Sequence, residues 1–200
     1  MSMAWRRGLL SISLRIQLGA LLFLASAVPG GLLMARPVDY QPWILVDTGA
    51  SEIRVMRGKE TLEVIPNISV GRGGVGYKSR EGDDVTPTGA FRIAWINRSS
   101  PFYRFFGFDY PTRSYAERAR MRHFLNEEEY RQIVEAHDQG EIPPQTTPLG
   151  GRVGIHGIGA ADARIHSRFN WTAGCVALTD RQIDRLSRWA HVGTLVVVTR

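Results

Sequence analysis

Short apolar runs separated by glycine-containing turns dominate the chain from Trp43 onward. In the clearest of them, apolar residues such as Leu62 and Val64 alternate with polar ones. A period of two is typical of half-buried β-strands, because successive side chains point to opposite faces. The pattern predicts a mainly β fold. The expected strands cover residues 43–47, 52–56, 61–70, 91–96, 151–156, 174–178 and 194–199.

A different composition runs from Asn97 to Leu149. Six aromatic residues fall between Phe102 and Tyr110, and a charged stretch with helical spacing follows over residues 114–137. Two consecutive prolines at 143 and 144 end any helix. We therefore predict a helical insertion at about 97–149 that covers one face of the β core.

One more helix is expected near the C-terminus. Thr179 with Gln182 three residues later forms a capping-box signature for a helix to about Ala190. The chain after residue 35 has about 165 residues, which suffices for one core and is too short for two full domains. We expect a single domain over 43–200, preceded by a linker at 36–42.

The first 35 residues have the layout of an export signal. Residues 1–15 carry three arginines and no acidic residue, and an apolar run follows over 16–35. The stretch 18–24 fits the apolar region of a signal peptide, and Ala25-Ser26-Ala27 supplies a small-residue cleavage site. An uncleaved membrane anchor is the alternative, since 20 residues just span a bilayer. Both interpretations place the domain outside the cytoplasm.

The basic composition has little to do with the domain itself. The formal charge of +6 falls to +3 once Arg6, Arg7 and Arg15 in the leader are set aside. No block of five or six basic residues occurs after the leader. We therefore expect no nucleic-acid partner.

Two motifs resemble known sites without the context those sites need. Residues 71–76 match GxGxxG, but the following residues 77–89 contain two glycines and a proline and predict no helix to hold a pyrophosphate. We interpret this segment as a flexible loop. Asp47-Thr48-Gly49 resembles an aspartic-protease motif, but that chemistry needs two carboxylates and no second copy exists. A hairpin turn is favoured, and an Asp47-dependent protease stays as an alternative.

The strongest candidate site combines the one cysteine of the chain, Cys175, with His156. A thiol needs a base or an imidazolium to act as a nucleophile, and His156 supplies either. We expect His156 to lower the pKa of Cys175, so that the thiol is alkylated well below pH 8.5. Gly174 before the nucleophile permits close approach of a carbonyl, with the N–H groups of Gly174 and Cys175 aimed at an oxyanion.

Other interpretations of these residues remain open at this point. A lone cysteine is often a buried small hydrophobic residue, and a lone histidine is often structural. A zinc site from His156, His166 and Cys175 is disfavoured, because these residues lack paired ligand spacing. We expect neither a metal nor a cofactor.

Two segments together resemble the L,D-transpeptidase (YkuD) family. Ile155-His156-Gly157 followed by residues 171–178, which read WTAGCVAL, is similar to the family's His-Gly and Ser/Thr-x-Gly-Cys signature. Residues 82–91, which read GDDVTPTGAF, are similar to an upstream family segment. The resemblance extends from about Trp43 to Arg200.

The resemblance implies a β-sandwich or barrel-like catalytic domain acting on peptidoglycan stem peptides. Cys175 would attack the carbonyl of the third residue, expel the terminal D-alanine and hold a thioester, with His156 as base. Gly157 would orient the imidazole, and Thr172 would sit beside the nucleophile. The acceptor stays open between an amine, giving a crosslink or protein attachment, and water. A non-catalytic, membrane-tethered wall-binding module is the other alternative.

This sequence departs from the family pattern at two positions. Many members carry His or Arg where this chain has Ala173, and Arg where it has Ala177. The missing arginine would be expected to hold an anionic substrate. Arginines of the insertion are candidate substitutes, although a solvated helix face explains them as well: Arg113, Arg118, Arg120 and Arg122.

We expect the insertion to form a lid or wall over the cleft between His156 and Cys175. Some of its aromatic residues should pack on the β core, and the others should face the substrate groove. If the insertion has no such role, the loop at 159–170 is the next candidate for substrate selection.

Overall fold

A computed structural model describes residues 41–200. The predicted leader at 1–35 and most of the predicted linker at 36–42 lie outside the described residues. None of the helices in the described part is long and apolar enough to cross a bilayer.

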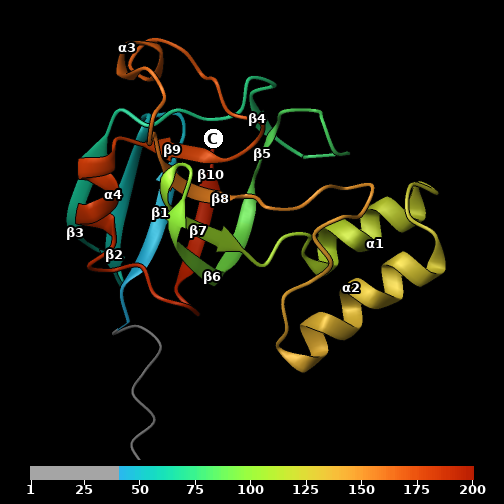
Figure 1. Cartoon of the computed structure of the whole chain (residues 1–200). Coiled ribbons are helices and arrows are strands. Elements are labelled where there is room, and N and C mark those ends of the chain that lie inside the picture. The colour runs from blue at the N-terminus through green and yellow to red at the C-terminus, as the bar shows by residue number, and fades with distance from the viewer. Residues whose placement is uncertain (1–40) are drawn as a thin grey trace, which may run out of the picture. The chain divides into compact units, whose positions relative to one another are not determined.

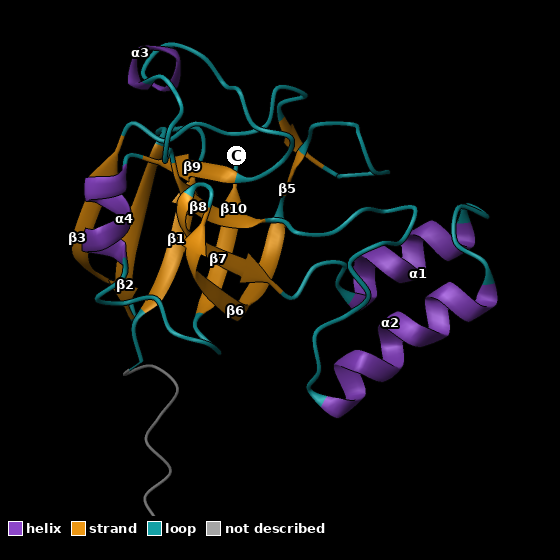
Figure 2. Ribbon diagram, viewed as in Figure 1, coloured by secondary structure: helices purple, strands orange, loops and turns teal. Residues whose placement is uncertain are grey.

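The domain is built on one large mixed sheet. The strands are β1 (Trp43–Asp47), β2 (Glu52–Arg57), β3 (Glu60–Pro66), β4 (Val75–Gly76), β5 (Thr86–Pro87), β6 (Gly89–Ser100), β7 (Tyr103–Phe108), β8 (Gly154–Gly157), β9 (Val176–Leu178) and β10 (Leu195–Thr199). Eight of them follow the order β3-β2-β1-β10-β6-β7-β8-β9, and β4 pairs with β5 separately (Figure 1). The pairs β1–β10 and β8–β9 are parallel. The prediction of a mainly β fold is confirmed, and Figure 2 shows how few helices accompany the sheet.

The outer edge of β9 is covered by the chain that follows β3. The Ser69 N–H donates to the Ala177 carbonyl at 3.1 Å, and the Ala177 N–H donates back at 2.7 Å. Gly71 forms a further bridge with Thr172. These bonds occupy backbone groups that an edge strand leaves unpaired. They also bring the segment that leaves one edge of the sheet against the opposite edge, so the sheet curls back on itself.

The core lies where alternating residues of the central strands face inward. In β1, Ile44 and Val46 are buried, and in β10 Val196 and Val198 are buried. Burial of such side chains contributes roughly 1.5–3 kcal/mol each. Helix α4 (Asp180–Leu186) begins at the predicted capping box, in which the Gln182 N–H donates to the Thr179 hydroxyl. This helix ends earlier than the predicted Ala190.

The structure corrects the predicted insertion at 97–149. Residues 97–108 belong to the long hairpin of β6 and β7, in the middle of the main sheet. Aromatic side chains pack well on a pleated surface, and Phe106 and Phe108 are buried in the core. The insertion proper therefore begins only after β7.

Two helices, α1 (Arg113–Met121) and α2 (Glu127–Gln139), form the helical part of the insertion. Asn126 caps α2 with a complete capping box to Glu129, which explains the break between the helices. Figure 1 shows this pair beside the sheet. Tyr115 of α1 anchors it, because its hydroxyl donates to the Thr88 carbonyl at 2.8 Å and its ring is buried.

Candidate active site

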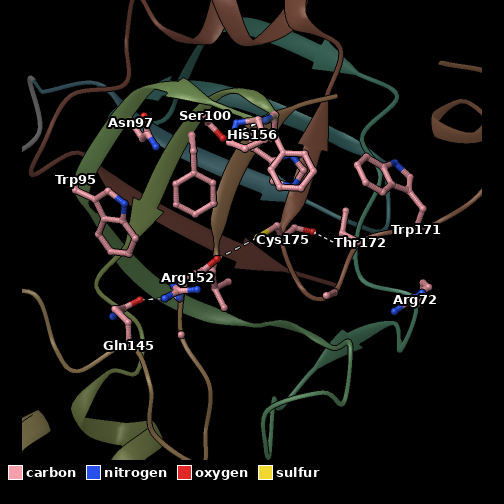
Figure 3. Close-up of a pocket in the computed structure, with 16 residues that line it drawn as sticks. Arg72, Trp95, Asn97, Ser100, Gln145, Arg152, His156, Trp171, Thr172 and Cys175 are labelled. Carbon is pink, nitrogen blue, oxygen red and sulfur yellow. Dashed lines mark hydrogen bonds between the residues drawn. The ribbon is translucent and has the colours of Figure 1, made fainter. Parts of the chain in front are cut away.

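The residues predicted to carry the chemistry line one cleft of about 850 Å³ (Figure 3). Cys175, His156 and Thr172 all contribute to its surface. A cleft of this size accommodates a small peptide-like ligand. Gly174 and Gly157 do not line it, and act through the backbone of the residues that do.

Parallel pairing of β8 with β9 brings Cys175 and His156 together. His156 lies opposite Ala177 in the register, and Cys175 precedes Ala177 by two residues. Side chains two residues apart on an extended chain point to the same face. The 19-residue gap in the sequence is therefore closed by adjacent strands.

His156 is held as a neutral imidazole with one free nitrogen. Its Nδ1 lies 2.6 Å from the carbonyl oxygen of Gly157. A carbonyl only accepts, so Nδ1 carries the proton and Nε2 keeps its lone pair. Burial lowers the pKa of His156; the hydrogen bond to Gly157 raises it and the charge of His166 lowers it further, with a net lowering. This tautomer is suited to a general base.

The environment of Cys175 contradicts the expected low thiol pKa. The thiol donates to the carbonyl oxygen of Arg152, with 3.4 Å between Sγ and that oxygen. Burial raises the pKa of Cys175 to about 11, although a backbone hydrogen bond from Gly154 and the charge of Lys78 act in the opposite direction. With His156 neutral, no imidazolium is present to stabilise a thiolate. The resting cleft therefore holds a thiol and a neutral imidazole.

The rate of alkylation of Cys175 by iodoacetamide should therefore rise about tenfold per pH unit from pH 6 to 9.5, because only the thiolate reacts. Intact-protein mass measures the rate. The same protein unfolded in urea is the control, and its rate should level off above an ordinary thiol pKa of about 8.5. If the alkylation rate of the folded protein levels off below pH 8, Cys175 and His156 form a thiolate–imidazolium pair instead.

A tight turn presents the nucleophile. The Thr172 hydroxyl donates to the Cys175 carbonyl at 2.6 Å and accepts from the Gly174 N–H at 3.2 Å. Gly174 has a φ of +126°, and a Cβ there would lie 2.8 Å from the Val85 carbonyl oxygen. Only glycine fits this conformation without strain. The Gly174 N–H already donates to the Thr172 hydroxyl, so it is not free for the oxyanion role predicted for it.

Gly157 accepts a hydrogen bond through its carbonyl and has no room for a side chain. Its carbonyl fixes the tautomer of His156. A Cβ at this position would meet the Asp180 Oδ1 at 2.5 Å and the Phe102 carbonyl oxygen at 2.8 Å. Any larger residue must therefore displace the backbone of Phe102, whose ring packs on His156.

The segment 78–86 forms a support beneath the nucleophile turn. Lys78 is buried and its ammonium donates to the Asp83 Oδ1 at 2.6 Å. Asp83 also accepts backbone N–H bonds from Ser79, Arg80 and Val85. Burial raises the pKa of Asp83, but these hydrogen bonds outweigh it and hold the pKa below its ordinary value. The Lys78 Nζ lies 3.7 Å from where a Cβ on Gly174 would be.

Replacing Asp83 by asparagine should destabilise the domain by about 3 kcal/mol at pH 7, because Lys78 loses its buried partner. The carboxylate contributes stability above its ordinary pKa, and the contribution is lost as pH falls through the lowered native pKa. The free energies of unfolding of wild type and Asp83→Asn should therefore become more similar below about pH 4. Urea unfolding at several pH values measures it.

Breaking an exposed ion pair serves as the control for this prediction. Arg164 pairs with Asp162 on the surface, and Arg164→Gln should leave the stability nearly unchanged. A similar loss in both variants, or a loss in Asp83→Asn that does not change with pH, would contradict the role assigned to the buried pair.

Aromatic side chains enclose His156 from several directions. The Phe102 ring centroid lies 4.5 Å from that of His156, and Trp171 meets the imidazole edge-on at 5.8 Å. Phe102, Phe105 and Trp95 line the cleft, whereas Phe106 and other members of the cluster are in the core. The predicted division of the aromatic cluster between core and groove is confirmed except at Tyr103, which is exposed and bonds to Asp184. The helices do not form the predicted lid or wall over the cleft, because neither α1 nor α2 lines it.

The cationic residues of the cleft are not those that the sequence suggested. The α1 arginines and Arg122 do not line it: Arg118 and Arg122 lie over the Tyr77 ring instead. Arg72 and Arg152 line the cleft, together with Gln145. Nothing in the spacing of the sequence indicated these three residues. Trp171 was detectable, because it directly precedes the nucleophile motif.

Neither competing motif has the structure that its own chemistry would need, and only Arg72 of the glycine-rich segment reaches the cleft. Asp47 ends β1, accepts from the Ala50 N–H at 2.9 Å and lies 3.5 Å from Arg54, as a turn residue does. The glycine-rich segment 71–76 forms a hydrogen-bonded turn and β4, and no helix follows it. Within residues 41–200, no group of three His, Cys, Asp or Glu side chains is placed to hold a metal ion.

Comparison with known proteins identifies the family. The profile of the L,D-transpeptidase catalytic domain (YkuD) matches residues 41–198, nearly all of the described chain. The chain belongs to the L,D-transpeptidase catalytic-domain family. No curated protein matches it.

Two structures of one solved protein support the same fold, and a third structure is a weaker match. A mutant of the helical cell shape determining protein Pgp2 from Campylobacter jejuni is 21% identical, with a TM-score of 0.53 over 80% of this chain and 47% of that one. The unmutated Pgp2 is 19% identical, with a TM-score of 0.52 over 80% and 48%. An L,D-transpeptidase from Xylanimonas cellulosilytica is 14% identical, with a TM-score of 0.45 over 82% and 63%. The chain thus spans less than two thirds of each of these proteins.

Both departures from the L,D-transpeptidase pattern now have a location. Ala173 is exposed and lines the cleft. Ala177 is fully buried, opposite His156 and bonded through its backbone to Ser69. Neither alanine carries a charge, so these two positions supply no cation to the cleft.

Proposed function

We propose that this protein is a cysteine acyltransferase that acts on peptidoglycan stem peptides. The observation that carries the proposal is the shared cleft of Cys175 and His156, in which the Gly157 carbonyl leaves Nε2 free to take a proton. Membership of the L,D-transpeptidase family supports the substrate class. The expected leader would place this chemistry outside the cytoplasm.

The proposed reaction has two steps. Sγ of Cys175 attacks the carbonyl of the third residue while His156 Nε2 takes the thiol proton. The tetrahedral intermediate collapses, the C–N bond breaks, and His156 returns the proton to the leaving D-alanine amine. An acceptor amine or water then attacks the thioester, loses a proton to His156, and the proton returns to the sulfur.

Surrounding residues support each stage. Thr172 and Gly174 hold the turn so that the Cys175 N–H faces the developing oxyanion. A neutral His156 is suited to general-base catalysis with a thiol whose pKa is high, since sulfur attack and proton transfer then proceed together. The aromatic side of the cleft excludes water from the imidazole.

Incubation with purified muropeptides and mass analysis of the products tests the proposal. Loss of the terminal D-alanine is expected, and the product identifies the acceptor: a crosslinked dimer, a peptide–protein adduct or a shortened peptide. Binding of muropeptides without any turnover by the wild-type protein would instead support the non-catalytic wall-binding module.

A further inference from the structure

The charged side chains that line the candidate cleft are cationic. Two arginines, Arg72 and Arg152, line it, and no acidic side chain does. The remaining polar lining, which includes Asn97 and Gln145, is neutral, and the lowered pKa of His156 keeps it uncharged at neutral pH. Such a cleft attracts an anionic ligand.

The two arginines differ in whether they already form an ion pair. Arg72 pairs with Asp84 at 2.8 Å. Arg152 is exposed and forms no ion pair within residues 41–200. A guanidinium without a carboxylate partner has all of its donors available for a ligand, and its planar fork matches a carboxylate.

The backbone of Arg152 is fixed next to the nucleophile. Its φ of +53° is uncommon for a residue with a side chain. Its N–H donates to Gln145 Oε1 at 2.6 Å, and the Gln145 amide donates to the carbonyls of Tyr110 at 2.8 Å and Pro143 at 2.7 Å. Its own carbonyl accepts from the Cys175 thiol. Unusual backbone conformations held by several bonds are concentrated at functional sites.

We propose that Arg152 binds a carboxylate of the acyl donor beside the bond that Cys175 attacks. The inference deepens the proposed function, on which it rests, by naming a substrate class: peptides with a free carboxylate on or next to the residue that becomes the acyl group. Arg152 thereby supplies, from the strand-entry turn before β8, the cation that buried Ala177 does not provide.

A pair of small alkylating agents tests the charge at the sulfur without any turnover. Iodoacetate is anionic and iodoacetamide is neutral, so the ratio of their rates at Cys175 reports local attraction of a carboxylate. In Arg152→Gln this ratio should fall about tenfold, the range of a hydrogen bond to a charged group. Arg152→Lys should retain part of the ratio.

Two further variants make this test decisive. Arg152→Gly adopts the positive φ without strain and removes the guanidinium, so it should lower the ratio even if Arg152→Gln folds poorly. Arg113→Gln on α1 removes the same net charge away from the cleft, and its ratio should equal that of wild type. A ratio unchanged in both Arg152 variants, or lowered equally in Arg113→Gln, would overturn the proposal.

Substrate analogues test the same contact during turnover. Two donor peptides are compared that differ only in this carboxylate, which is free in one and amidated in the other. Arg152→Gln should lower kcat/KM at least about tenfold for the peptide with the free carboxylate and leave kcat/KM for the amidated peptide unchanged. Equal losses for both peptides would overturn the inference while the proposed function stands. If the wild type turns over neither peptide, the proposed function fails, and the alkylation ratio still decides whether Arg152 attracts a carboxylate.

Discussion

Replacement of Cys175 by alanine should abolish acyl transfer from stem peptides, with a loss in kcat of at least about four orders of magnitude. The sulfur forms the bond to the acyl group, and the chain has no other cysteine to replace it. Product formation from muropeptides measures the loss. Alanine differs from cysteine only by loss of the sulfur, so the variant should remain folded.

Asp47→Asn is the matched control for this prediction. Asp47 stabilises the turn after β1 and lies outside the cleft, so its variant should retain turnover of stem peptides and lose at most some stability. Pepstatin-sensitive proteolysis that survives Cys175→Ala and is lost in Asp47→Asn would reverse the assignment and establish the aspartic-protease alternative.

His156→Gln should lower kcat/KM by roughly 10²–10⁴-fold, because glutamine fills similar space but takes no proton. The wild-type profile of kcat/KM against pH should have an acid limb. Since burial lowers the pKa of His156, the active neutral form persists below pH 6.5, and activity should be lost only as pH falls through that lowered pKa.

The same profile in the variant supplies the control. His156→Gln should lack this acid limb at its residual rate, whereas Asp47→Asn should keep it. An acid limb centred above pH 6.5 would mean that His156 is stabilised as an imidazolium, and an unchanged kcat/KM in His156→Gln would remove it from the mechanism.

Local sequence signals were sufficient for much of the fold. Short apolar runs predicted β1, β2 and β10 nearly to the residue, and the Thr179–Gln182 capping box predicted the start of α4. These features depend on neighbours in the chain. The aromatic run at 102–110 was misassigned to the insertion: most of it forms β7, which lies in the main sheet between the adjacent β6 and the distant β8.

The same distinction between local and tertiary features applies to the candidate site. Motif spacing selected Cys175 and His156, which the structure places in one cleft. The sequence predicted a low thiol pKa, whereas the surroundings of the sulfur raise the pKa of Cys175, and such surroundings are a tertiary property that no motif encodes. Gln145 and Arg152 escaped detection for a similar reason: their importance comes from a loop that returns to the nucleophile after two helices.

A thioester on Cys175 can be observed directly in the mass of the protein shortly after mixing with a disaccharide tetrapeptide. We expect an adduct equal to the donor minus its terminal D-alanine. It should lie on the Cys175 peptide, be released by hydroxylamine as a thioester is, and be missing in Cys175→Ala. An adduct that persists in Cys175→Ala, or turnover by the wild type through a reaction that never labels Cys175, would contradict this mechanism.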